Sequence, residues 1–135
     1  METREIELET GELLVTDVTA HAAELALGRG DGLLHLFTPH ATAGLGLMET
    51  GSGSEHDLAA AVERLLPRTA DYRHRHGSPG HGADHLLPLF VSPSLVVSVL
   101  GGELRLGSWQ RIVLIDPNRD NRRRRLQLSF LAAQR

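Results

Sequence analysis

Histidine is concentrated in one short polar part of this sequence. Four of the chain's eight histidines lie within residues 72–85, namely His74, His76, His81 and His85. Near neutral pH an imidazole donates a proton, accepts one or binds a metal ion, so the cluster suits acid–base or metal chemistry. His74 and His76 share a face in an extended segment, and His81 and His85 share a face in a helix. A solvated polar loop is the alternative interpretation.

Two different metal sites fit these spacings. In the first, His74 and His85 join His40, and three neutral imidazoles with an open position are the ligand count of a catalytic zinc site. In the second, the four local histidines form a closed, structural site, which requires a turn at residues 77–80. The spacing leaves both arrangements open. The expected cofactor is a divalent metal, zinc or magnesium.

Other side chains add candidate groups for binding or proton transfer. Glu49 precedes a glycine-rich turn, where a surface acid is the simpler interpretation. Asp57 suits capping of the following helix. Its carboxylate also suits a hydrogen bond that orients a metal-binding imidazole through the ring nitrogen that does not hold the metal. Trp109 fits a core or interface anchor, while Gln110 offers an amide donor and acceptor to a ligand. The arginine run that includes Arg122 fits a solvated strand or an anionic ligand.

Length and composition limit the class of protein. A chain of 135 residues fits one domain, and its 41% hydrophobic content supports a core without covalent cross-links. The absence of cysteine excludes disulfides, thiolate zinc sites and cysteine nucleophiles. A net charge of −3 argues against a general nucleic-acid binder. No apolar run approaches the ~20 residues of a membrane helix, and Met1–Glu5 shows no secretion leader, so we expect a cytoplasmic protein without a membrane partner.

The periodicity of apolar residues predicts an α+β fold. Strand character is seen at residues 5–9, 13–18, 33–37, 43–48, 95–100, 103–106, 110–116 and 125–131. Helices are expected at 19–27 and 54–66, where Ser54–Asp57 reads as a capping box, with a shorter third helix near 83–87. We expect 5–9 to pair with 13–18, and 95–100 to form a hairpin with 103–106. Allowing for segments that do not form separate strands, we expect about seven strands in antiparallel, sandwich-like sheets with two or three helices.

The order of these landmarks resembles the YjbQ-like family, which is labelled secondary thiamine-phosphate synthase. The resemblance covers nearly the whole chain, and its specific part is the Leu-Gly-x-Trp-Gln element together with the upstream histidines. The landmarks are His40-x-Thr42-Ala43, Glu49, Asp57, Tyr72-Arg73-His74, His85-Leu86, Leu106-Gly107-x-Trp109-Gln110 and the run Arg122–Arg125. The chain departs from the family in having Met48 before the glutamate and Ser98 where a proline is usual.

The resemblance implies one YjbQ-like domain over residues 1–135, antiparallel sheets and a homotrimer. It implies a cleft in which His40, His74 and His85 converge and bind a divalent metal. His76 and His81 are extra histidines on this mapping.

Further roles follow for residues around that cleft. Glu49 and Asp57 join the three histidines as expected catalytic residues. Trp109, Gln110 and Arg122 are expected to bind the ligand or cofactor.

The family label implies a transferase acting on small phosphorylated molecules. It would join a pyrimidine diphosphate to a thiazole phosphate, giving thiamine phosphate and pyrophosphate. Two alternatives are a metal-dependent hydrolase of a small phosphorylated substrate and a non-catalytic trimer that binds a metal or an anion. We expect no nucleic-acid partner.

Overall fold

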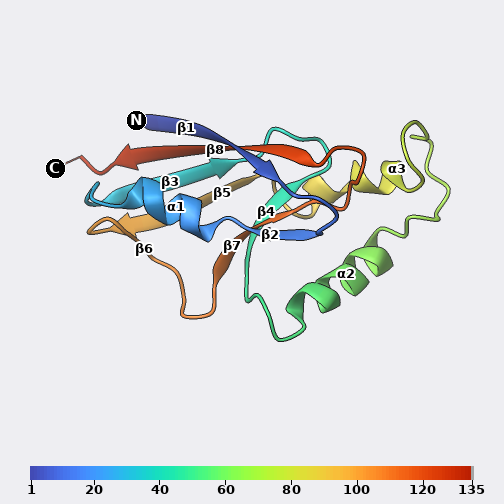
Figure 1. The fold of residues 1–135 in the computed structure, drawn as a ribbon, viewed down its shortest axis with the longest axis horizontal. Helices are drawn as coiled ribbons and strands as arrows, with labels where there is room; N and C mark the ends of the chain where they lie inside the picture. Colours follow the sequence, from blue (N-terminus) through green and yellow to red (C-terminus); the bar gives the residue numbers. More distant parts are fainter. Residues whose placement is uncertain (135) are drawn as a thin grey trace.

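The structure, a computed structural model that describes residues 1–134, contains two antiparallel sheets, one helix packed on the sheets and further helices at one end (Figure 1). The expected α+β class is confirmed, with eight strands in the described residues rather than about seven. In chain order the elements are β1 (Glu2–Glu9), β2 (Val15–Asp17), α1 (Thr19–Ala26), β3 (Gly32–Phe37), β4 (Gly44–Met48), α2 (Ser54–Leu65), α3 (His81–Asp84), the 3-10 helix η1 (Leu87–Leu89), β5 (Ser94–Leu100), β6 (Glu103–Leu104), β7 (Arg111–Ile115) and β8 (Arg123–Ala132).

The larger sheet has the strand order β1-β8-β3-β5-β6, and the smaller has the order β2-β7-β4. Inward-facing residues of the larger sheet, such as Leu34 and Leu128, pack with Leu25 of α1 and with Ile112 and Leu114 of β7. This contact forms the main hydrophobic core. Burial of these aliphatic side chains supplies most of the driving force for folding.

Strand β7 is buried on both of its faces, which places a second core on the far side of the smaller sheet. Val113 and Ile115 pack there against Leu66, Ala83 and Leu87. The molecule therefore has three layers, namely the larger sheet, the smaller sheet, and α2 with α3. Figure 1 shows α2 and α3 at the end of the molecule opposite the two termini.

The pairing expected between residues 5–9 and 13–18 is wrong. Strand β1 pairs with β8 instead, and β2 pairs with β7. Opposite charges explain the choice, because Glu5 lies 3.7 Å from Arg125, and Glu9 lies 3.8 Å from Arg123. Opposite charges across antiparallel strands stabilise the pair. The hairpin of β5 and β6 across Gly101-Gly102 is confirmed.

The capping box expected at Ser54–Asp57 is also wrong. Helix α2 begins after Gly53, whose φ of 91° is left-handed, and no side chain caps that end. The Glu55 carboxylate accepts a hydrogen bond from the Gly51 N–H at 2.8 Å instead. The helix itself lies where the apolar pattern predicts it.

A glycine-rich turn brings the histidine-rich segment back onto α3. Gly77 and Gly80 have φ angles of 83° and 85°, which glycine adopts at little cost. The His81 N–H donates to the Ser78 carbonyl oxygen at 3.1 Å, which closes the turn. In the part of the chain that the structure describes, none of the helices has the length and apolarity of a membrane span.

Candidate metal centre

The four histidines of residues 74–85 gather in one place. The ring centroid of His74 lies 4.0 Å from that of His76 and 4.4 Å from that of His85. The rings of His81 and His85 are 4.5 Å apart. One ligand atom from each of His74, His81 and His85 lies within 4.8 Å of the other two. The structure thus brings together three of the four histidines of the local arrangement, and His76 lies outside this group among the described residues.

The Nδ1 atom of His81 lies within hydrogen-bond distance of two polar side chains. Its Nδ1 lies 3.0 Å from Asp120 Oδ2 and 2.9 Å from Asn118 Nδ2, while its Nε2 lies 2.7 Å from His85 Nε2. Histidine ligands of metals almost always bond a carboxylate, a carbonyl or water through the second ring nitrogen. His81 therefore has the environment of a metal ligand.

The environment also keeps imidazoles neutral. Desolvation, reinforced by the neighbouring His76 and His81, lowers the pKa of His74 below its usual 6.5. Desolvation and the charges of His81 and His74 lower the pKa of His85 in the same way. A neutral imidazole is the form that binds a metal ion.

A buried carboxylate lies beneath the cluster. Asp84 is 1% exposed, pairs with Arg68, and accepts a hydrogen bond from Asn118 Nδ2 at 3.1 Å. Burial raises the pKa of the Asp84 carboxyl, and the Arg68 guanidinium opposes that rise. Asn118 thus links the buried ion pair to His81.

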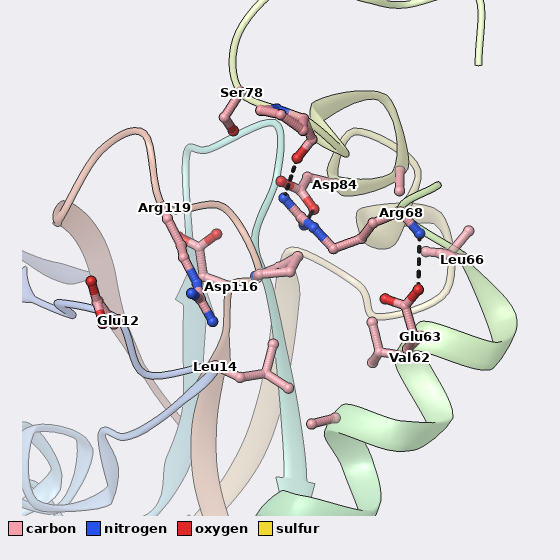
Figure 2. A pocket seen from close by; sticks show the side chains of 14 residues that line it. Glu12, Leu14, Val62, Glu63, Leu66, Arg68, Ser78, Asp84, Asp116 and Arg119 are labelled. Carbon is pink, nitrogen blue, oxygen red and sulfur yellow. Dashed lines mark hydrogen bonds and ion pairs between the residues drawn. The ribbon is translucent and has the colours of Figure 1, made fainter. Parts of the chain in front are cut away.

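Two cavities adjoin at this end of the molecule and share Arg68, Ser78 and Pro79. The smaller, about 320 Å³, is lined by His74 and His81. The larger, about 540 Å³, lies between α2 and the start of β2, and Figure 2 shows Arg119 pointing into it. Both volumes lie in the range of small-molecule sites, about 300–1,000 Å³.

His40 does not join the histidine group of the described residues. Its Nε2 accepts a hydrogen bond from the backbone N–H of Arg125 at 2.8 Å, so this ring nitrogen is already bonded to strand β8. Desolvation, then the positive charge of Arg124, lowers the pKa of His40 below 6.5. Among the described residues, the group that His74 and His85 form includes His81 and not His40, so the set of His40, His74 and His85 stays a prediction.

Replacement of His40 by glutamine should flatten the dependence of stability on pH. The folded state favours the neutral imidazole, so the stabilisation from His40 is present above the unfolded pKa of 6.5 and is lost as pH falls below it. Urea unfolding should show a smaller loss of stability in His40→Gln than in the wild type between about pH 7.5 and about pH 5.5. His21→Gln, on the exposed side of α1, is the control; equal pH dependence in wild type and His40→Gln would contradict the account.

The two acids expected near the histidines are exposed. Glu49 lies just after β4, and Asp57 lies in the first turn of α2. Neither belongs to the metal-binding group among the described residues. Their catalytic roles stay predictions.

The three residues expected to bind a ligand or cofactor lie on the surface. Trp109 is 75% exposed in the loop before β7, so it is not a core anchor. Gln110 Oε1 accepts a hydrogen bond from the Gly107 N–H at 2.8 Å, which uses its acceptor within the loop. Arg122 lies 3.7 Å from Glu12. Their binding roles also stay predictions.

Sequence reasoning missed the polar groups that support the site. Arg124 is 4% exposed and Asp116 is 5% exposed, and the two form a buried ion pair. Asn118 donates its backbone N–H to Asp116 Oδ1 at 3.0 Å. The alternation of β8 was the available signal, because Arg124 has the same parity as the inward Leu126 and Leu128.

The sequence and the α+β fold match a known class of protein. The family model described as "UPF0047 protein YjbQ-like" matches residues 4–133. The chain belongs to this family.

Three similar proteins show how widely the similarity extends. UPF0047 protein Rv2556c of Mycobacterium tuberculosis is 50% identical over 131 residues, which are 97% of this chain and 98% of that protein. The crystal structure of a hypothetical protein from Aeropyrum pernix K1 has a TM-score of 0.87 and 30% identity, with 98% of this chain and 100% of that chain covered. A YjbQ-like protein of unknown function from Sulfolobus solfataricus, with a TM-score of 0.90 and 21% identity over 98% of this chain and 97% of that chain, shares the fold.

Proposed function

We propose that this protein is a metal-dependent enzyme that acts on a small phosphorylated molecule, with His74, His81 and His85 holding the metal. The observation that carries the proposal is that their ligand atoms lie within 4.8 Å of one another. Three imidazoles are the ligand count of a catalytic zinc site. Nitrogen donors favour zinc, whereas magnesium prefers oxygen, so zinc is the better of the two expected metals.

The His81 and His85 ring nitrogens would have to move apart slightly to hold one zinc ion together. His81 Nε2 and His85 Nε2 are 2.7 Å apart, a distance at which they share a proton. Two nitrogens on a tetrahedral zinc, at about 2.0–2.1 Å each, lie about 3.3 Å apart. Rotation of one imidazole by a small angle supplies that difference.

Residues around the centre suit an anionic substrate. A bound zinc ion polarises a phosphoryl or carbonyl oxygen of a substrate. Arg68 and Arg75 line the smaller cavity, and Arg119 lines the larger. Guanidinium groups pair well with phosphate oxygens. The apolar side chains Leu14 and Val62 of the larger cavity would shield a substrate from water.

The specific reaction is the one that the family resemblance implies. The methylene carbon of the pyrimidine diphosphate loses its bond to the diphosphate oxygen and gains a bond to the thiazole nitrogen, and pyrophosphate leaves. Two adjoining cavities that share Arg68 support a reaction with two substrates. The Arg68 guanidinium at their common wall, which also pairs with Asp84, is the positively charged group nearest to both cavities and suits the leaving diphosphate.

The experiment is an assay of the zinc-loaded protein with each precursor alone and with both together. Thiamine phosphate formed only when both are present would support the synthase reaction. Phosphate released from a single precursor would contradict the synthase reaction and support the metal-dependent hydrolase. Metal binding without turnover would leave the non-catalytic alternative. His74→Ala should abolish any product, and His21→Ala, an exposed histidine of α1, is the matched control.

Assembly as a homotrimer is a further proposal from the resemblance. The outer face of the larger sheet supports it, because Leu33, Val96 and Leu131 are 46%, 53% and 41% exposed. Leu33 and Leu131 are direct partners across β3 and β8. Contiguous exposed apolar side chains of this kind are typical of protein interfaces. The molar mass in solution is the measurement that distinguishes a monomer from a trimer.

A further inference from the structure

His81 has more hydrogen-bond partners than its neutral ring can serve at one time. Its Nδ1 lies within hydrogen-bond distance of both the Asp120 carboxylate, at 3.0 Å, and the Asn118 amide nitrogen, at 2.9 Å. The carboxylate only accepts a hydrogen bond, whereas the amide nitrogen only donates one. The Nδ1 atom can therefore satisfy only one of them in each tautomer.

The hydrogen-bond partner of Nδ1 determines whether the ring proton is on Nδ1 or on Nε2, and therefore whether Nε2 has a free lone pair. When Nδ1 accepts from Asn118, the ring proton is on Nε2 and points to His85 Nε2, 2.7 Å away. When Nδ1 carries the proton and donates it to Asp120, the lone pair of Nε2 is available to a cation. A metal ligand must offer that lone pair.

We propose that Asp120 is a positioning residue that holds His81 in the tautomer able to bind a metal ion, and that Asn118 holds the competing tautomer. This inference rests on the proposed metal centre. Neither residue binds the metal itself. Both act on the Nδ1 atom of one ligand.

Asp120 is well placed for this role. Its backbone N–H donates to Asn118 Oδ1 at 3.0 Å, and its Oδ2 accepts from the Ser78 N–H at 3.3 Å. Its side chain is 37% exposed, so its replacement leaves the hydrophobic core intact. Asn118 keeps an alternative acceptor, Asp84 Oδ2 at 3.1 Å, when His81 turns to Asp120.

The test is the affinity for zinc, measured by competition with a chromophoric chelator. Asp120→Ala should weaken zinc binding by about 10–100-fold, the usual effect of losing such a partner. Asp71→Ala is the matched control, because this exposed carboxylate pairs with Arg75 and its loss changes the net charge equally. That variant should bind zinc within about twofold of the wild type.

A second readout separates positioning from a general structural effect. Imidazole nitrogen chemical shifts of the metal-free protein should show the His81 proton moving to Nε2 in Asp120→Ala, because Asn118 is then the remaining partner of Nδ1. Asp120→Asn keeps an acceptor oxygen of the same shape, so it should retain more affinity than Asp120→Ala. Asp120→Leu, which has methyl groups where the carboxylate has its oxygens, removes the acceptor and serves as the test if the alanine variant does not fold.

The possible results separate a failure of the role of Asp120 from a failure of the proposed metal centre. A wild-type protein that binds no zinc would refute the metal centre itself. Zinc binding by the wild type, with equal affinity in Asp120→Ala or in Asp120→Leu when that variant stands in, would overturn the role of Asp120 and leave the metal centre intact. Weakened binding with no change of tautomer would also overturn it.

Discussion

Replacement of Arg124 by alanine is expected to lower the free energy of unfolding by about 3–5 kcal/mol, the usual cost of removing one partner of a buried ion pair. Arg124 and Asp116 are 4% and 5% exposed. Without the guanidinium, the Asp116 carboxylate stays buried with only neutral donors, the Asn118 N–H at 3.0 Å and the Thr42 hydroxyl at 3.4 Å. Urea unfolding at neutral pH measures the effect.

The neighbouring arginines are the matched controls for this prediction. The side chains of Arg123 and Arg125 are 73% and 55% exposed, and their ion pairs with β1 span 3.7–3.9 Å. Exposed pairs of this kind contribute about 0–1 kcal/mol each. If Arg124→Ala is no less stable than Arg123→Ala, the buried ion pair does not stabilise the fold as this prediction requires.

Alanine at His74, His81 or His85 is expected to reduce zinc affinity by about 100-fold or more, above the range for an outer partner. Each substitution removes one of the three nitrogens that lie within 4.8 Å of one another. His40→Gln should keep the affinity of the wild type, because the His40 ring bonds to β8 instead. Chelator competition measures all four variants.

His76 provides an internal comparison for the same experiment. Its ring centroid lies 4.0 Å from that of His74 but 6.2 Å from that of His85. We expect His76→Ala to weaken zinc binding less than the other three local substitutions. A pattern in which His40 and not His81 is essential would show that the metal set is the distributed one.

Several elements of the fold could be predicted from local patterns. Helix α2 shows apolar residues at helical spacing, and the hairpin of β5 and β6 has two glycines at its turn. The partner of β1 depends on residues more than a hundred positions away, so the short connection at Gly11 was a poor guide. The acidic character of β1 and the basic character of β8 were a usable signal, since Glu7 faces Arg125 in the sheet.

The candidate site was predictable only in part, for a related reason. His74, His76, His81 and His85 converge through a local turn, which Gly77 and Gly80 make possible. The supporting residues Asn118 and Asp120 come from the β7–β8 loop.

Placement of that loop depends on the three-layer packing. Its contact with the histidines is a property of the whole fold, and the periodicity of one segment does not report it. The set with His40 was one of the two arrangements that the residues allowed, and in the structure His40 lies in the loop between β3 and β4 and accepts a hydrogen bond from β8.

The most direct test of the metal centre is anomalous scattering at the zinc edge from crystals of the zinc-loaded protein. The account predicts one strong peak per chain, about 2.0–2.1 Å from a ring nitrogen of each of His74, His81 and His85. A peak bound by His40, or no peak within reach of His81, would contradict it.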